Sequence, residues 1–442
     1  MSDNPLKKID VAGLEISPIT KEKLLEQIAD RVSKKQKTFV VTPYSEFLYS
    51  SLRRPEVREL LNSSDYAIAD GIGILWARYF LSIPLTLKNY YLNIVQAWWQ
   101  VAWTGATILL RPSLLYKHIP EKIVGADLIW DLSKLAAEKN FTVYLLGSRG
   151  DIGEQAANKL KEKYPTLQIV GTSNKDMYDP TITTDIKQAN PDMLFVAFKA
   201  QEAEVWISNH LSELPASFAI ALGGTFDYIA GAKKQPPKII RGIGLEWLYR
   251  LITQPSRFKR IINATFGLVL GLVRHKVFSS MSYRQSVIAV VVNAENKILV
   301  VQRNPLDPYL IATGNEGKEY KFANYWQFVR GGTEKNEDLE QTARRELREE
   351  MNIHNVEFIK VSNRKIIYDW TNALRPLINN IYHHKGQEQT ILYFKFNTQE
   401  QPIKPDGKEL VNYQWLEIDE LQNIIYKENM DLVELVKSDL KG

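Results

Sequence analysis

Residues 331–353 read GGTEKNEDLEQTARRELREEMNI, and this stretch decides the fold of the C-terminal part of the chain. Residues 339–350 contain no glycine or proline, so they suit a helix. On that helix Glu346, Glu349 and Glu350 stand at positions i, i+3 and i+4, which places three carboxylates on one face. Like charges at that spacing repel one another, whereas Mg²⁺ takes oxygen ligands and also bridges substrate phosphates. The spacing therefore predicts a metal site at these three residues, and the alternative is an ordinary solvated helix of mixed charge.

The same stretch resembles the Nudix box, the loop–helix–loop signature of hydrolases that cut diphosphates linked to a second moiety. It departs at Asn352, where the family usually has glycine, and Asn is the residue that best replaces glycine at a left-handed helix exit. The resemblance implies a divalent cation, Mg²⁺ or Mn²⁺, held by the three glutamates, with Glu346 and Glu349 as catalytic residues. Arg345 is expected to orient the acidic loop by pairing with Glu337 or a neighbouring residue. The box residues implied are Gly331, Glu337, Arg345, Glu346, Glu349 and Glu350.

The rest of the C-terminal sequence fits such a domain. Residues 285–303 contain two β-branched runs around Asn293 and Asn296, which is typical of a β-hairpin. After the box come a strand-like run, TILYFKF, and a final helix. We therefore expect an α/β/α Nudix domain over residues 282–442, with Glu388 or Glu409 as candidates for an additional acid or base.

Length and composition bound the remaining possibilities. A chain of 442 residues predicts two or three domains, and 45% hydrophobic with 24% charged residues is typical of a globular protein. The net charge of +5 suits anionic substrates or an anionic membrane surface and gives little support to a nucleic-acid binder. The absence of cysteine excludes disulfides, thiolate metal sites and cysteine nucleophiles. The first residues lack the apolar run of a signal peptide, so a cytosolic start is expected.

The N-terminal half shows the pattern of an α/β domain. Residues 38–42 and 66–68 read as short strands, and a helical stretch follows each of them. Thr42 and Asp70 stand where these strands end, which is where open α/β sheets usually bind ligands. Three further strands are predicted at 141–146, 193–198 and 218–222, and the first and last run into glycine-rich turns.

These stretches resemble the WecG/TagA/CpsF family of glycosyltransferases, glycosyltransferase family 26. The segments that carry the resemblance are VVTPYSEFLY (40–49), SSDYAIADGIGILWA (63–77), EKIVGADL (121–128), VYLLGSRGDIGEQAA (143–157), ALGGTFDYIAG (221–231) and GLEWLYRLITQPSRFKR (244–260). The resemblance implies a Rossmann-like fold over residues 1–245. It also implies inverting transfer of an N-acetylmannosamine-type sugar from a UDP-sugar to a polyprenyl-diphosphate-linked acceptor, without an obligatory metal.

The resemblance also assigns roles to single residues. It implies Asp70 as the general base on the acceptor hydroxyl and Thr42 as part of the donor site. Nucleotide-pocket turns are expected at Gly147, Gly223, Gly224 and Asp227. Three positions depart from the family pattern: Tyr44 replaces an Asn, Lys122 stands where Arg is common, and Ala203 replaces a Gln. Tyr44 and Lys122 remain candidate substrate-binding residues.

Two segments suggest a membrane surface. Residues 86–119 form an insertion relative to the family, uncharged from Asn89 to Leu110 and rich in tryptophan and tyrosine. This pattern favours a helix in the membrane interface over a buried helix, and both over a spanning helix. Residues 246–281 combine an apolar run with basic clusters and are expected to be an amphipathic membrane-surface appendage and linker, the alternative being a core helix.

The sequence therefore predicts a bifunctional enzyme, a glycosyltransferase followed by a Mg²⁺-dependent Nudix pyrophosphohydrolase, at the inner face of the cytoplasmic membrane. The alternative is an active Nudix enzyme whose altered transferase domain binds nucleotide sugar as a regulatory module.

Overall fold

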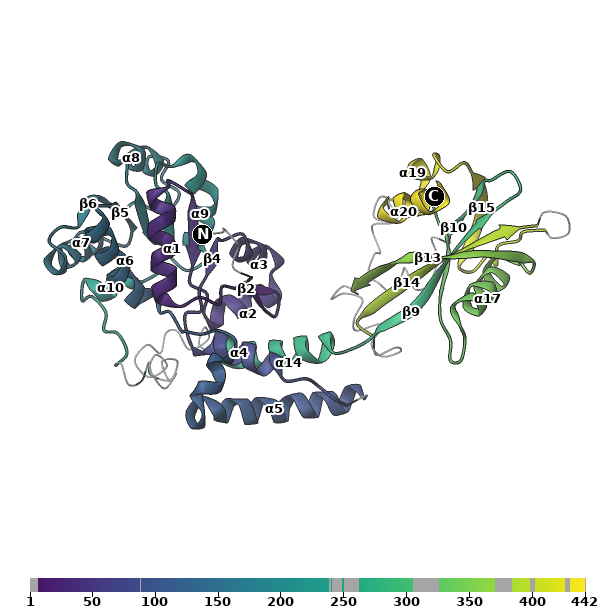
Figure 1. Ribbon diagram of the computed structural model, residues 1–442, viewed down its shortest axis with the longest axis horizontal. Coiled ribbons are helices and arrows are strands. Elements are labelled where there is room, and N and C mark those ends of the chain that lie inside the picture. Colours follow the sequence, from purple (N-terminus) through teal and green to yellow (C-terminus); the bar gives the residue numbers. More distant parts are fainter. Residues whose placement is uncertain are drawn as a thin grey trace. The chain divides into compact units, whose positions relative to one another are not determined.

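The computed structural model describes residues 7–87, 89–237, 240, 249, 262–304, 326–369, 384–397, 402–425 and 430–441. The chain divides into two compact units, Met1–Val277 and Phe278–Gly442 (Figure 1). Each unit has its own sheet and its own buried clusters, and each is therefore described separately.

A parallel sheet forms the centre of the first unit. In the described part of this unit, its six strands lie in the order β4-β3-β8-β7-β5-β6. The strands are β3 (Thr38–Val41), β4 (Tyr66–Ala67), β5 (Thr142–Gly147), β6 (Gln168–Ser173), β7 (Met193–Ala197) and β8 (Phe218–Ala221). Every neighbouring pair is parallel. The carboxyl ends of these strands therefore meet at one edge of the sheet, as the predicted α/β pattern requires.

Helices cover both faces of this sheet because the strands are apolar on both sides. Successive residues of β5 alternate between the two buried clusters, with Tyr144 and Leu146 on one face and Val143 and Leu145 on the other. One face is covered by α2 (Ser45–Arg53), α3 (Pro55–Asn62), α4 (Ile72–Ser82), α8 (Ile182–Ala189) and α9 (Glu202–His210). The other is covered by α1 (Lys21–Ser33), α6 (Gly125–Lys139), α7 (Ile152–Lys163) and α10 (Thr225–Ile229). A small hairpin, β1 (Ile9–Val11) and β2 (Leu14–Ile16), and two 3₁₀ turns, Pro112–Lys117 and Leu211–Glu213, complete the set.

Two helical segments extend this core. Helix α5 (Tyr90–Leu110) lies within the predicted insertion and packs against α4 (Figure 1). The π-helical turn η4 (Asn263–Gly267) leads into α14 (Leu268–Ser279). Leu268, Leu272 and Val273 of α14 are buried in the core. This part of the 246–281 segment thus packs as the core helix that was the alternative expectation, whereas residues 246–248 and 250–261 lie outside the described residues. None of the described helices combines the length and the apolarity needed to cross a bilayer.

The second unit is built on a mixed sheet. In its described residues the strand order is β11-β10-β9-β14-β13, with β12 paired to β9 and β15 paired to β10. The strands are β9 (Tyr283–Val292), β10 (Ile298–Arg303), β11 (Trp326–Gln327), β12 (Val329–Gly332), β13 (Val356–Asp369), β14 (Gly386–Phe396) and β15 (Leu410–Leu416). The predicted hairpin of β9 and β10 is present, although the two strands share a single registered pair and mostly bond to other strands.

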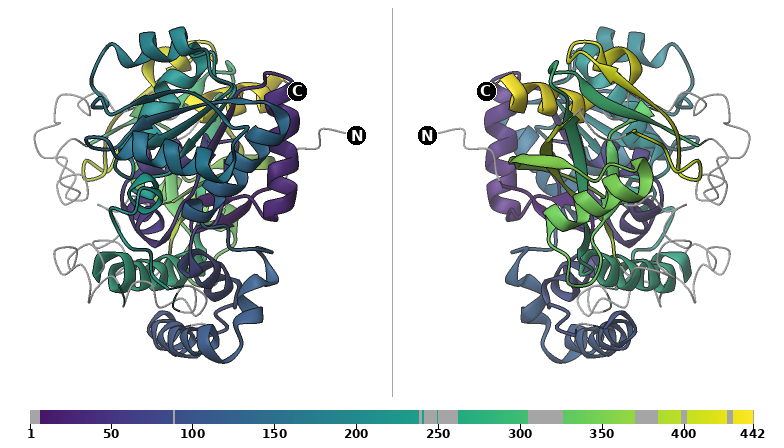
Figure 2. Two further views of the ribbon diagram at one scale, coloured as in Figure 1. Left: turned by 90° about the vertical axis from the view of Figure 1, so that its left-hand side faces the viewer. Right: turned by 90° about the vertical axis from the view of Figure 1, so that its right-hand side faces the viewer.

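Helices also lie on both sides of this second sheet. Helix α17 (Leu339–Met351) packs through Ala343 and Leu347 against one side, and its position in front of the sheet is visible in Figure 2. On the opposite side lie α19 (Leu421–Ile424) and α20 (Met430–Lys441), the latter through Val433 and Val436. This is the predicted helix–sheet–helix arrangement.

Candidate active sites

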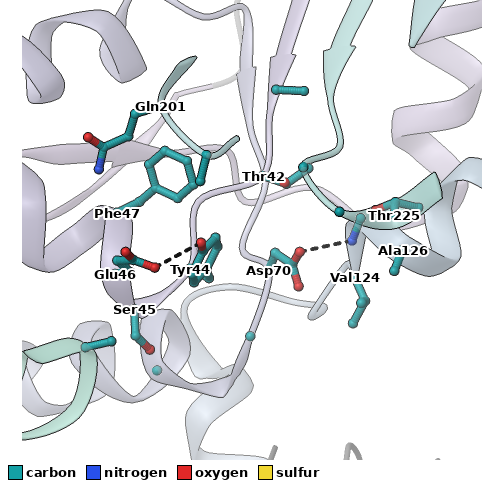
Figure 3. Close-up of a pocket in the computed structure, with 18 of the residues that line it drawn as sticks. Thr42, Tyr44, Ser45, Glu46, Phe47, Asp70, Val124, Ala126, Gln201 and Thr225 are labelled. Atoms are coloured by element: carbon teal, nitrogen blue, oxygen red, sulfur yellow. Dashed lines mark hydrogen bonds between the residues drawn. The ribbon is translucent and has the colours of Figure 1, made fainter. Parts of the chain in front are cut away.

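A cavity of about 1250 Å³ lies at the carboxyl edge of the first sheet. The cavity is lined by residues that follow the strands of this sheet, namely Thr42 after β3, Asp70 after β4, Ser148 after β5, Phe198 after β7 and Gly223 after β8. Segments that are far apart in the chain, such as those around Thr42, Asp70 and Thr225, therefore meet in space (Figure 3). A cavity of this size holds a ligand as large as a nucleotide sugar.

Asp70 is held in this cavity by backbone contacts. Its amide donates to the carbonyl of Pro43 at 2.9 Å, and its Oδ2 accepts from the amide of Gly125 at 3.2 Å (Figure 3). Gly125 is the first residue of α6, so the carboxylate faces the positive end of a helix dipole. Gly71 follows with φ of +123°, a backbone conformation that side chains rarely adopt. The Asp-Gly pair therefore turns the chain sharply into α4 and leaves the carboxylate at the cavity wall.

Gly125 is a site residue that the sequence analysis quoted within a motif but did not single out. A Cβ atom placed on it would lie 3.3 Å from Thr42 Oγ1 and 3.4 Å from Asp70 Oδ2. The absence of a side chain therefore lets the end of α6 approach both predicted residues. The sequence feature that could have identified Gly125 is its position directly before Ala-Asp-Leu, where a helix begins.

The other predicted donor residues divide into two groups. The first group lines the cavity together with Thr42 and consists of Tyr44, Gly223, Gly224 and Asp227. The Tyr44 hydroxyl donates to Glu46 at 3.1 Å, and Asp227 pairs with Lys233 at 2.5 Å. Gly147 and Lys122 are not among the lining residues.

Gly147, the last residue of β5, instead allows the Phe198 ring to pack closely against the backbone of this strand. It has a φ of +93°, and a Cβ on it would lie 2.9 Å from the Phe198 ring. The next two residues, Ser148 and Arg149, are the ones that line the cavity, and Arg149 brings a positive charge to it.

The segment that carries the Ala203 departure has an unexpected arrangement. Ala203 is fully buried in the core, whereas its neighbours Gln201 and Glu204 line the cavity. Gln201 has a φ of +73°, and its amide donates to Glu204 Oε2 at 2.6 Å. Burial raises the pKa of Glu204 to about 7. Arg54 and Ser50 hold the Gln201 side-chain amide, so Gln201 supplies a fixed polar group at the cavity wall.

The second candidate site surrounds α17. Asp338 caps the start of the helix, because its carboxylate accepts from the Gln341 backbone amide and its own backbone amide donates to the Gln341 side chain. Asn352 caps the other end with a φ of +59°. The expectation that Asn352 takes the left-handed exit is confirmed. Position 331 requires glycine for a steric reason, because a Cβ there would lie 1.9 Å from Glu346 Oε1. The box thus closes the loop onto the acidic face of the helix.

Arg345 lies at the centre of this acidic face. Its Nε is 2.8 Å from Glu337 Oε1, and its Nη1 is 2.9 Å from Glu346 Oε1 and 3.1 Å from Glu349 Oε2. The predicted pairing with Glu337 is confirmed, and hydrogen bonding to Arg345 lowers the pKa of Glu337 to about 2. Arg345 also donates to the carbonyl of Gly332 at 3.0 Å, so it fixes the loop to the helix.

Among the described carboxyl groups of this site, Glu350 has the pKa that is raised furthest above its usual value. It is 7% exposed, and its Oε2 atom is buried without a hydrogen-bond partner. Burial, followed by the negative charges of Glu346, Glu409 and Asp406, raises its pKa to about 9. Glu346, Glu409 and Asp406 therefore lie near enough to disfavour the charged form of Glu350. Of the two additional candidates, Glu409 belongs to this group, whereas Glu388 pairs with Lys365 at 2.5 Å on the β13–β14 ladder.

These residues fit a divalent cation in their chemistry. Within the described ranges no three His, Asp or Glu side chains are grouped so as to hold a metal ion together, because Arg345 draws Glu346 and Glu349 to itself. The orphaned oxygen of Glu350 nevertheless needs a positive partner, and the surrounding oxygens are those that Mg²⁺ prefers. Glu346, Glu349 and Glu350 are therefore the residues that would hold it.

Comparison with known families finds a match for each of the two units. The model of the glycosyl transferase WecG/TagA/CpsF family matches residues 9–104 and 88–282. The chain belongs to this family. The NUDIX domain model matches residues 282–435. The protein is therefore an enzyme with two parts, a glycosyltransferase and a NUDIX hydrolase domain.

The segments that align with this chain cover most of the length of each curated relative. An N-acetylglucosaminyldiphosphoundecaprenol N-acetyl-beta-D-mannosaminyltransferase from Staphylococcus aureus (strain MRSA252) is 25% identical over 257 residues, 58% of this chain and 88% of the relative. A protein of the same name from Bacillus subtilis (strain 168) is 27% identical over 225 residues, 51% of this chain and 75% of the relative. Among solved structures, the MutT protein from Methanosarcina mazei Go1 is 16% identical, covering 37% of this chain and 98% of its own, with a TM-score of 0.27.

Proposed function

We propose that the first unit transfers an N-acetylmannosamine-type sugar, with inversion, from a UDP-sugar to a polyprenyl-diphosphate-linked acceptor in polysaccharide biosynthesis. The observation that carries this proposal is the position of Asp70. Its carboxylate lies in a cavity formed by the ends of parallel strands and is held there by the Gly125 amide. The names of the two relatives support the sugar and the lipid-linked acceptor.

The chemistry needs one base and a stabilised leaving group. The acceptor hydroxyl oxygen attacks the anomeric carbon, the bond to the nucleotide oxygen breaks, and UDP leaves with the electron pair. Asp70 takes the proton of the attacking hydroxyl. Thr42, Tyr44, Asp227, the backbone at Gly223 and Gly224, and Arg149 surround the space for the donor. Arg149 can offset the negative charge of the diphosphate without a metal ion.

For the second unit we propose Mg²⁺-dependent hydrolysis of a nucleoside-diphosphate-linked compound. Its support is the group of carboxylates at Glu350 and the Arg345 network that orders the loop. A bound Mg²⁺ or Mn²⁺ supplies Lewis-acid activation of water and substrate phosphate. Glu346, Glu349 and Glu350 would hold it, and Arg345 and Glu337 keep the loop at Gly331 closed onto the helix.

The acceptor of the relatives is attached to a lipid, which supports a place of action at the inner face of the cytoplasmic membrane. We therefore propose that the protein associates peripherally with that surface. A nucleic-acid partner is not part of this proposal, because the net charge is only +5.

The test uses the full-length protein with UDP-N-acetylmannosamine or UDP-N-acetylglucosamine, a lipid-linked acceptor, and either Mg²⁺ or EDTA. We expect acceptor-dependent UDP release that survives EDTA and falls at least a hundredfold in Asp70→Asn. Asp131→Asn is the matched control, since Asp131 forms only a partly exposed ion pair with Lys21. Undiminished transfer by Asp70→Asn would refute the assignment of the base.

The second activity is read in the same samples as UMP release. It should require Mg²⁺ and disappear in Glu349→Gln, while Glu340→Gln on the same helix should leave it unchanged, because Glu340 pairs with Arg344 instead. UMP release without any UDP release would favour the alternative function, a NUDIX enzyme with a regulatory nucleotide-sugar domain. If neither nucleotide appears, both assignments fail.

A further inference from the structure

Helix α5 has its polar side inside and its apolar side outside. Its buried residues are Asn93, Ala97, Gln100, Thr104 and Thr107. Its exposed residues are mostly large and apolar, and the exposed fractions are 73% for Trp99, 66% for Val95 and 63% for Tyr91. No charge interrupts the helix from Asn89 to Leu110. A helix that faces water has the opposite arrangement, so this face is suited to an apolar environment.

The buried polar residues fix α5 firmly in this orientation. Thr104 Oγ1 accepts from the Trp76 indole at 3.0 Å, and Gln100 donates to the carbonyl of Pro84 at 3.0 Å. The ammonium of Lys276 on α14, a residue only 4% exposed, donates to Gln100 Oε1 at 2.5 Å and also to the carbonyl of Phe80. Hydrogen bonds therefore join α5 to α4 and to α14, and the exposed face belongs to a fixed helix.

The C-terminal half of α5 also forms a wall of the Asp70 cavity. The lining residues on α5 are Val101, Gly105, Ile108 and Leu109, and those on η4 and α14 are Ala264, Thr265, Phe266, Leu268 and Val269. Leu109 and Phe266 line the cavity yet are 61% and 65% exposed, so they stand at its mouth. We call this set of nine residues the apolar wall. It connects the space beside Asp70 with the exposed apolar face of α5.

We propose that the apolar wall binds the first isoprene units of the lipid-linked acceptor and thereby presents the acceptor sugar to Asp70. This inference rests on the proposed transferase function. A nucleotide sugar has no group that matches an uncharged wall of aliphatic and aromatic side chains, whereas a polyprenyl chain does. The continuity of the wall with the apolar face of α5 gives the lipid a path from the bilayer that avoids water.

Gly105 offers a direct test. A Cβ added there meets no atom within 4 Å, so a larger side chain fits into the cavity without displacing its neighbours. Replacing glycine in a helix interior also favours the helix by roughly 1 kcal/mol. Gly105→Leu should therefore fold, and its side chain should occupy cavity space beside the apolar wall. Ala106→Leu is the matched control, because Ala106 is the next residue on the helix, is exposed and does not line the cavity.

The experiment compares a long-chain polyprenyl-diphosphate acceptor with an acceptor of the same sugar diphosphate carrying a short alkyl tail, both in detergent. For Gly105→Leu we expect the KM for the long-chain acceptor to rise at least tenfold and the KM for the short-tail acceptor to change less than twofold. Ala106→Leu should change neither. Equal changes with the two acceptors, or no change with either, would overturn the proposal.

A second measurement separates this proposal from the proposed function. Binding of a long-chain polyprenyl diphosphate, without donor sugar, is followed by native mass spectrometry of the full-length protein. Binding that is lost in Gly105→Leu supports the apolar wall even if no sugar is transferred by the wild type, in which case the transferase assignment alone has failed. If Gly105→Leu binds this lipid as well as the wild type and changes the sedimentation coefficient, the wall is a contact between two copies of the chain and the proposal is wrong.

Discussion

At the scale of single residues, Gly125 shows how a missing side chain makes room for Asp70, the proposed base. Gly125→Ala introduces a Cβ 3.3 Å from Thr42 Oγ1 and 3.4 Å from Asp70 Oδ2, closer than most Cβ contacts. We expect kcat for sugar transfer to fall roughly tenfold, about 1.4 kcal/mol in the barrier, because Asp70 must shift. The melting temperature should change little, since alanine suits the first turn of a helix. A variant with unchanged kcat would show that Asp70 tolerates the shift or is not the base.

Glu350 gives a prediction that depends on pH. Its pKa in the folded protein is about 9, against a usual value of 4.5. Below pH 4.5 the group is protonated in both the folded and the unfolded state, and between pH 4.5 and 9 only the unfolded state loses the proton. The folded state is therefore destabilised progressively as the pH rises through this range. In EDTA, Glu350→Gln should be the more stable protein at pH 8, with a smaller difference at pH 5.

The same substitution also tests the metal site. Added Mg²⁺ should raise the melting temperature of the wild type more than that of Glu350→Gln, because binding to the folded state is lost with the carboxylate. Thermal denaturation with and without Mg²⁺ measures both effects. Equal stabilisation of the two proteins by Mg²⁺ would exclude Glu350 as a ligand.

At the scale of helices and strands, Lys276 connects α14 with α4 and α5. Burial lowers its pKa to about 8 from the usual 10.5, so the folded state holds fewer protons than the unfolded state between these values. Stability should therefore rise with pH between 8 and 10.5, by at most about 3 kcal/mol. Lys276→Met keeps the side-chain length and removes the charge, so this rise should be absent in the variant. Urea titrations of both proteins at pH 7.5 and 10 measure it, and an equal pH dependence would contradict the assignment.

Sequence periodicity predicted the elements well where each residue's environment is local. The strand ends at Thr42 and Asp70, the acidic face of α17 and the left-handed exit at Asn352 all depend on neighbours in the chain, and the structure contains them. Contacts between distant segments could not be predicted in this way. The contact of Gly125 with Asp70 and that of Lys276 with Gln100 join residues more than fifty positions apart. The local sequence marks Gly125 only as part of a motif at an expected helix start and Lys276 only as one of several basic residues, so neither contact follows from it.

The α5 segment shows the same limit more sharply. The absence of charge between Asn89 and Leu110 favours a helix in the membrane interface, whereas polar residues such as Gln100 and Thr104 weaken the prediction of a helix that spans the membrane. The structure assigns these polar residues to the protein side, where Lys276 and Trp76 bind them. Their partners lie on α14 and α4, so the orientation of α5 needed the tertiary structure.

At the scale of the whole molecule, the chain combines a glycosyltransferase with a NUDIX domain, and under the proposed function both act on diphosphates. The transferase releases UDP under the proposed function, and the NUDIX unit would cut a nucleoside-diphosphate-linked compound. A shared compound, such as the nucleotide sugar or a lipid diphosphate, is a reasonable hypothesis. It fails if the NUDIX unit hydrolyses only unrelated compounds such as nucleoside triphosphates.

The two compact units also predict the thermal behaviour of the whole protein. Because each unit has its own sheet and buried clusters, calorimetry of the full-length chain should show two transitions. UDP should raise only the transition of the first unit, by RT ln(1 + [L]/Kd), and Mg²⁺ should raise only that of the second. Asp70→Asn should preserve the UDP effect, since Asp70 acts on the acceptor hydroxyl, while Glu350→Gln should reduce the Mg²⁺ effect. A single transition that both ligands raise would show that the units unfold together and that binding in one stabilises the other.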